Sequence, residues 1–216
     1  MTLASKRPLA CFLSTLLTIA PLSLAYETPL QSDSVREAYF LGKHSDQKTT
    51  SFLGNYMKHL PMPEQGPYIS EITLYTPYAQ VVLNSWRSTL GYSAQQAEED
   101  YRSHADMIRV RVRIEFTPTY TAVQGVKPNK DSTTQQAYVF RPEDFWRDFL
   151  FELHQEKGPI KPRDSKGAPI YDDGFTGAEV WLGYDAKTVK SEETEFEVIT
   201  PDGQHVIAKF DLSKLR

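Results

Sequence analysis

The sequence contains a single cysteine, Cys11, among its 216 residues. Cys11 falls in the first 25 residues, which have the pattern of a cleaved leader, so we expect the mature chain to contain no disulfide. A secreted domain without disulfides must be stabilised by a substantial apolar core. Without cysteine, the mature chain also cannot form a zinc site built on cysteine thiolates.

Basic residues are also in the minority, with 24 Lys and Arg against 28 Asp and Glu. The leader would remove Lys6 and Arg7 and no acid, so the mature chain is more acidic still. Affinity for nucleic acid comes largely from Lys and Arg on phosphates. We therefore expect no nucleic-acid partner.

No motif of a metal, cofactor or catalytic site is present. The five histidines form no His-x-His or His-x-x-x-His pair, and there is no Gly-x-Ser-x-Gly elbow. The acids Asp164, Asp172 and Asp173 suggest a carboxylate loop, but their spacing matches no calcium motif. We predict no metal and no cofactor, and a hydrolase built from His154, His205 and Asp172 is an alternative that requires the fold to bring them together.

The first 25 residues are read as a secretory signal. Lys6 and Arg7 precede an apolar run over residues 9–20, and Ser23 and Ala25 place small residues before a cut at Tyr26. The run is shorter than the roughly 20 residues of a stable membrane span. We predict a bacterial periplasmic or secreted protein cleaved near Ala25, with an uncleaved anchor as the alternative. The lack of an Asn-x-Ser/Thr sequon suits a bacterial origin.

Residues 108–116 alternate apolar and charged side chains without a break. This period of two predicts a strand with an apolar face on the core and a charged face carrying Arg109, Arg111 and Arg113. The arginines could bind a phosphate, a carboxylate or an acidic polymer. The alternative, which we favour, is a sheet face whose charges are matched by Glu195 and Glu197. Residues 108–116 and 195–199 are then expected to be neighbouring strands, or at least to share a face.

Helices are expected early in the chain. A capping box at Ser34 and Glu37 predicts a helix over 35–41 that Gly42 interrupts, and a second helix is predicted over 47–59. Thr76, followed by proline, predicts a helix over 78–89, with a strand as the rival interpretation. A further capping box at Ser93 opens a short helix that reaches residue 101.

Strands and turns dominate the rest. We predict strands over 69–75, 136–140 and 179–184, a helical turn over 142–144, a strand over 149–154 that forms a hairpin with 159–161, a loop over 162–177, and a final hairpin of 195–200 with 205–212. The fold class is therefore α+β, an antiparallel β-sandwich for which an immunoglobulin-like arrangement is one candidate. Its domains are a signal peptide over 1–25, a helical N-terminal arm over 26–67, and a sandwich with inserted helices over 68–216.

Trp181 lies opposite Val180 and Leu182 on its predicted strand. It either stacks on sugar rings from an exposed sheet face or belongs to the core, which we favour because large aromatics dominate core burial.

Residues 68–102 and the segment 198–203 resemble uncharacterised exported bacterial proteins. The resemblance implies no activity and no catalytic residue. The export signal, the sandwich-like strands and the absence of a catalytic motif instead lead us to expect a non-catalytic exported binding or assembly module whose partner is an unknown protein or glycan. A hydrolase and a carbohydrate-binding domain that uses Trp181 are the alternatives.

Overall fold

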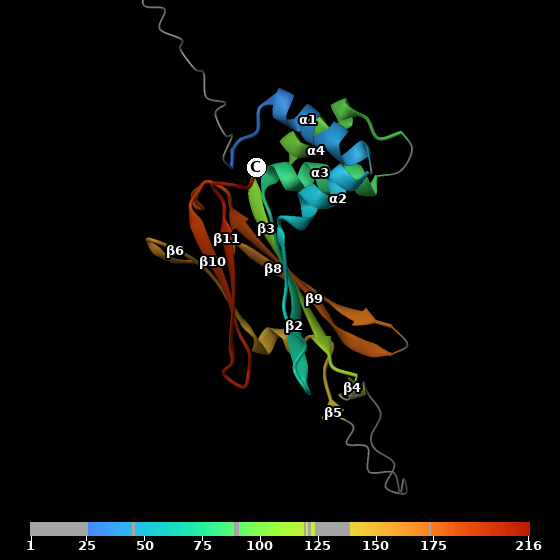
Figure 1. Cartoon of the computed structure of the whole chain (residues 1–216), viewed down its shortest axis with the longest axis vertical. Helices are drawn as coiled ribbons and strands as arrows, with labels where there is room; N and C mark the ends of the chain where they lie inside the picture. Colours follow the sequence, from blue (N-terminus) through green and yellow to red (C-terminus); the bar gives the residue numbers. More distant parts are fainter. Residues whose placement is uncertain are drawn as a thin grey trace, which may run out of the picture.

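The computed structural model describes residues 26–44, 46–88, 91–118, 120, 122–123, 139–172 and 174–216. The predicted leader over 1–25, the segment 124–138 and Asp173 lie outside these residues. In the described part, two antiparallel sheets form a sandwich, and four helices gather at one end of it (Figure 1). The predicted α+β sandwich is confirmed.

The larger sheet has five strands in the order β1-β2-β3-β9-β8. Its strands are β1 (Met57–His59), β2 (Pro67–Tyr75), β3 (Met107–Phe116), β8 (Asp164–Tyr171) and β9 (Phe175–Asp185). The smaller sheet has four strands in the order β11-β10-β6-β7. They are β6 (Leu150–Gln155), β7 (Gly158–Ile160), β10 (Glu193–Ile199) and β11 (His205–Asp211). A short parallel pair, β4 (Ala122–Val123) and β5 (Val139–Phe140), lies apart from both sheets.

The helices form one layer above the sandwich. They are α1 (Ser32–Lys43), α2 (Gln47–Gly54), α3 (Pro77–Arg87) and α4 (Ala94–Ser103), and α1 packs against α3 and α4. The Thr76 hydroxyl accepts a hydrogen bond from the Ala79 amide and caps α3, so the strand alternative for this segment is wrong. The predicted capping box of Ser93 and Gln96 is present at the start of α4. None of the described helices has the length and apolar character needed to cross a membrane.

The core lies between the facing sheets. Ile108, Val110, Val112 and Ile114 of β3 are completely buried, as the alternation predicts. The other sheet contributes inner-face side chains of β6, β10 and β11: Leu153, Phe196, Val198, Ala208 and Phe210. The predicted hairpins β6–β7 and β10–β11 are both confirmed by antiparallel pairing.

The first helix differs from its prediction because tertiary packing decides its limits. It begins at Ser32 and runs through Gly42 to Lys43. A Cβ on Gly42 would lie 2.3 Å from the carbonyl oxygen of Val82, so this glycine permits close packing of α1 on α3 and does not interrupt the helix. Ser34 lies inside the first turn, where its hydroxyl donates to Glu27, and no capping box forms there.

Two further predictions are wrong. The second helix ends at Gly54, because Met57–His59 pairs with β2 and becomes β1. The turn predicted over 142–144 is present, since the Phe145 amide donates to the Pro142 carbonyl at 3.1 Å, and the 3₁₀ helix η1 (Phe145–Asp148) follows it.

The predicted loop over 162–177 contains the edge strand β8, which pairs with β9. An edge position tolerates Pro169, because its missing N–H need not join a ladder. Position 167 favours glycine because a Cβ there would lie 2.2 Å from the Trp146 ring.

The expected pairing of residues 108–116 with 195–199 is also wrong. Strand β3 lies between β2 and β9, whereas β10 lies between β6 and β11 in the other sheet. Their charged faces point outward on opposite sides of the sandwich, so Glu195 and Glu197 cannot match the arginines. Glu195 pairs instead with Lys209 at 2.5 Å.

Candidate functional site

The outer face of the five-stranded sheet holds the arginines that the sequence singled out. Acids of the same sheet match them. Arg109 Nη1 lies 2.6 Å from Asp164 Oδ1 on β8, and Arg113 Nε lies 2.6 Å from Glu115 Oε1 on β3 itself. Arg109 and Arg113 therefore belong to a paired sheet face, but their partners are not the predicted glutamates of β10.

Arg111 is the most enclosed of the three, with 14% of its side chain exposed. Its Nη2 donates to Glu71 on β2, and its Nη1 lies 3.9 Å from Glu179 on β9. Its guanidinium also lies about 6 Å from the ring centroids of Tyr75 and Trp181, within cation–π range. Arg111 thus joins three neighbouring strands across the outer face.

Removing this central cation is expected to destabilise the fold. Arg111→Met keeps most of the stem but leaves Glu71, itself 13% exposed, without its main partner, and we expect a loss of about 1–3 kcal/mol. Arg113→Met is the matched control, because the Arg113 pair is more exposed and should cost no more than about 1 kcal/mol. Urea unfolding of both variants checks the difference. Equal losses would show that Arg111 is no more important than an ordinary surface charge.

Trp181 is half-buried on the same outer face. Its ring stacks on Tyr75 with centroids 5.8 Å apart and planes inclined by 17°, and its Nε1 donates to Glu179 Oε1 at 2.7 Å. Burial raises the pKa of Tyr75, so this tyrosine stays neutral in the stack. Trp181 is therefore neither a fully exposed sugar platform nor a member of the inner core.

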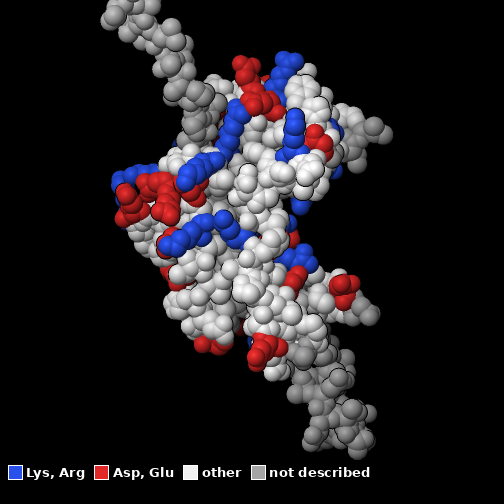
Figure 2. Space-filling view, in the orientation of Figure 1, with Lys and Arg blue, Asp and Glu red and all other residues white. Residues whose placement is uncertain are grey.

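A hollow of about 500 Å³ lies where α3 meets this face. Asn84 and Arg87 of α3 form one wall, and Arg109, Lys166 and Trp181 line the sheet side. Figure 2 shows an indentation in the right side of the molecule, between the helices and the sheets, and charged side chains border this indentation. The predicted candidates Arg109 and Trp181 thus share one concavity, whereas Arg111 and Arg113 do not line it.

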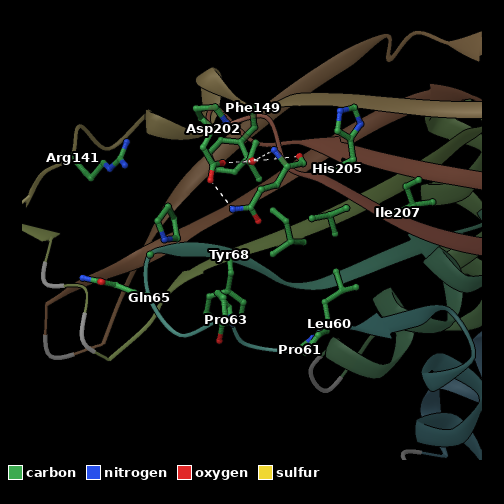
Figure 3. Close-up of a pocket in the computed structure, with 17 residues that line it drawn as sticks. Leu60, Pro61, Pro63, Gln65, Tyr68, Arg141, Phe149, Asp202, His205 and Ile207 are labelled. Carbon is green, nitrogen blue, oxygen red and sulfur yellow. Dashed lines mark hydrogen bonds between the residues drawn. The ribbon is translucent and has the colours of Figure 1, made fainter.

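A second concavity lies between the edges of the two sheets (Figure 3). It is a groove of about 500 Å³. Leu60, Pro61 and Pro63, which follow β1, form one wall, and His205 and Ile207 of β11 lie on the other (Figure 3). Sequence reasoning missed this groove, because it joins segments far apart in the chain.

Polar groups lie at one end of the groove. Asp202, in the turn between β10 and β11, accepts hydrogen bonds from the Thr200 hydroxyl and from Gln204 Nε2 (Figure 3). The Thr200 bond lowers the pKa of Asp202, so its carboxylate is charged at neutral pH. Arg141 also lines the groove.

The backbone of β11 is only half satisfied by β10. Hydrogen-bonded and non-hydrogen-bonded pairs alternate in an antiparallel ladder. The Thr200 amide donates to the Gln204 carbonyl at 3.0 Å, and the Leu212 amide donates to the Glu192 carbonyl at 3.2 Å. The register is unbroken between these two hydrogen-bonded pairs. His205, and every second residue of β11 after it, is therefore in a non-hydrogen-bonded pair with β10 and directs its N–H and C=O away from that strand.

A third feature is a cluster on the outer face of the four-stranded sheet. It unites Glu152 and His154 of β6, Glu197 of β10 and His205 of β11. The two histidines proposed for a hydrolase therefore meet the same glutamate, but Asp172 follows β8 in the other sheet and does not join them. The Glu-x-His spacing on a strand was the available sequence signal, since it places both side chains on one face.

Comparison with known proteins adds no assignment. The sequence matches no protein-family model, and no curated protein is similar to it. What the chain does is therefore inferred from its own residues.

Proposed function

We propose that this chain is an exported, non-catalytic binding module that captures an extended segment of a partner protein. The observation that carries the proposal is the edge of β11 beside the groove, with which no further strand pairs among the residues that the structure describes. Strand addition to such an edge supplies affinity through main-chain hydrogen bonds and specificity through pockets for alternate side chains. Export is supported by the leader pattern of Lys6, Arg7 and Ala25.

The free edge and the groove coincide. His205, Ile207 and Lys209 direct their backbone groups away from β10, and His205 and Ile207 also line the groove. The groove ends at Ile207 on β11, and beyond that end Lys58 Nζ of β1 lies 5.9 Å from the ring centroid of Phe210. An added strand would therefore pair first with His205 and Ile207.

The facing wall explains why this edge stays open. Pro61 and Pro63 have no N–H, so the segment after β1 cannot close the gap by pairing with β11. Natural sheet edges are usually guarded by charge, short strands or proline on the edge itself, and Lys209 is such a charge on β11. Ile207, two residues earlier, is apolar and 47% exposed. An added strand would cover this side chain.

The groove also indicates the chemistry of the partner segment. Apolar side chains at alternate positions would contact Leu60, Pro61 and the Phe149 ring, all of which line the groove. The charged Asp202 at one end favours a lysine or arginine in the segment. An extended peptide with alternating apolar residues and a basic end fits best.

Substituting the edge backbone provides the test. Peptides are selected from a displayed library of short random sequences against the purified protein, and their affinity is measured by calorimetry. Ile207→Pro removes an N–H that β10 does not use, so the fold should persist while peptide affinity falls at least tenfold, or about 1.4 kcal/mol.

A side-chain pair supplies the control. Ile207→Asp places a charge in the groove, whereas Leu150→Asp alters an apolar side chain of the same sheet that is 59% exposed but does not line the groove. We expect only the first to weaken binding. Failure to select any peptide, or peptides that bind Ile207→Pro as well as the unaltered protein, would rule the proposal out.

A second candidate is the carbohydrate-binding function, favoured by Trp181 and Asn84 in the hollow beneath α3. An indole beside polar and cationic groups can stack on a sugar ring and bind an attached acid. Trp181→Ala would then abolish binding to a glycan array while Ile207→Pro left it intact. A silent array would eliminate this candidate.

A further inference from the structure

The cluster on the outer face of the four-stranded sheet brings one imidazole nitrogen between two carboxylates. His154 Nε2 lies 3.0 Å from Glu152 Oε2 and 3.5 Å from Glu197 Oε2. One ligand atom from each of the three residues lies within 4.8 Å of the others. These side chains come from the two central strands of the sheet, so the backbone holds them in place.

The spacing suits a metal ion. In a tetrahedral Zn²⁺ site with bonds of about 2.0–2.2 Å, neighbouring ligand atoms lie roughly 3.3–3.6 Å apart. The two distances from His154 Nε2 lie close to this range, and the carboxylate oxygens of Glu152 and Glu197 lie within 4.8 Å of each other, so side-chain rotation would complete the geometry. A single N–H, in contrast, cannot donate well to two carboxylates at once.

The register makes a cation favourable. Glu152 and Glu197 are direct cross-strand partners on the same face. Like charges in this position destabilise a sheet, and a divalent cation between them would convert the repulsion into attraction. The side chains remain partly exposed, from 18% for Glu197 to 44% for Glu152, so an ion can enter from solvent and keep a water ligand.

His205 supports the arrangement from the neighbouring strand. Its Nδ1 lies 2.6 Å from Glu197 Oε1, the oxygen that does not face His154. A partner of this kind orients a ligating carboxylate and is itself a determinant of metal affinity.

We propose that Glu152, His154 and Glu197 form a binding site for a divalent transition-metal ion, with His205 positioning Glu197. One imidazole and two carboxylates suit Zn²⁺ and its first-row neighbours. Ca²⁺ takes 6–8 oxygen ligands, which this cluster does not supply. The bound ion would join β6 to β10 on the face opposite the core, and His205 is the residue that this site shares with the lining of the groove.

Calorimetric titration of chelator-treated, dialysed protein with Zn²⁺ tests the site. We expect one ion per chain, no measurable heat with Ca²⁺, and a higher Tm with Zn²⁺ present. His154→Ala and the nearly isosteric Glu197→Gln should abolish measurable binding, and His205→Ala should weaken it roughly tenfold or more. When no metal is added, the two histidine variants should melt like the unaltered protein, and Glu197→Gln should melt at the same temperature or higher, because it removes one of the two like charges.

His59→Ala is the matched control. His59 is a histidine on the outer face of the other sheet, with its Nδ1 3.9 Å from Glu71, and its removal should leave Zn²⁺ binding unchanged. Absence of binding to the unaltered protein, or binding that survives both His154→Ala and Glu197→Gln, would overturn the assignment. So would equal losses in the His59 and His154 variants.

Discussion

Gly177→Ala is expected to cost the fold more than about 3 kcal/mol, above the usual range of roughly 1–3 kcal/mol for overpacking. Gly177 lies in β9, paired with Glu115 of β3. A Cβ there would lie 2.0 Å from the carbonyl oxygen of Ile114 and 3.1 Å from the Cα of Glu115. Both are backbone atoms of the neighbouring strand, so the clash can be relieved only by separating β9 from β3, the central pair of the larger sheet.

Gly54→Ala is the control for this substitution. Gly54 ends α2, and nothing lies within 4 Å of the position that its Cβ would occupy. The change should be neutral or stabilise the protein by about 0.4–1 kcal/mol, because alanine reduces the freedom of the unfolded chain. Thermal and urea unfolding of both variants measure the contrast. A Gly177 variant as stable as the Gly54 variant would show that β3 and β9 are not packed this closely.

Phe145→Ala is expected to have the second large effect, a loss of about 3–5 kcal/mol. Phe145 opens η1 and is almost fully buried. Its ring lies 5.2 Å from Phe116 of β3, 5.9 Å from Phe175 of β9 and 6.0 Å from Phe149, which precedes β6. One side chain thus connects the ends of both sheets, and its removal leaves a cavity that strands from two layers would have to fill.

Phe40→Ala provides the comparison, because Phe40 of α1 is 47% exposed and its ring lies against Tyr39 and Arg36 of the same helix. Surface substitutions of this kind usually change stability by no more than about 0.5 kcal/mol. The free energy of unfolding from urea titration distinguishes the two. Similar losses would mean that the aromatic cluster around Phe145 does not hold the sheets together.

The sequence predicts structure well within a single strand or hairpin, where the pattern depends only on residues that are close together in the chain. The alternation over residues 108–116 reports a backbone period of two, and Ile108, Val112 and their neighbours are buried accordingly. The hairpin of β10 and β11 follows from local turn chemistry around Asp202 and Gly203. Such signals are contained within a few residues, so no knowledge of the rest of the fold is needed.

The pairing of distant strands could not be predicted in this way. Glu195 and Glu197 have the right charge and spacing to match the arginines, but so do Glu71, Glu179 and Asp164, and only the sheet order decides. The groove and the cluster around His154 have the same origin. Both depend on which strands become neighbours, a choice made by the packing of the whole core.

Tertiary packing also overrode local helix signals. Tyr56 and Leu60 extend the helical spacing of Phe52 and Leu53, yet pairing with β2 makes the residues between them, 57–59, a strand. Gly42, a helix breaker by propensity, is retained inside α1 because α3 approaches it closely.

Amide hydrogen exchange of β11, measured with and without a selected peptide, tests the proposed function most directly. In the free protein, Val206 and Ala208 should exchange slowly because their amides bond to β10, whereas His205 and Ile207 should exchange fast. Bound peptide is expected to slow His205 and Ile207 selectively. Protection confined to the hollow around Trp181, with the β11 amides unchanged, would contradict strand addition.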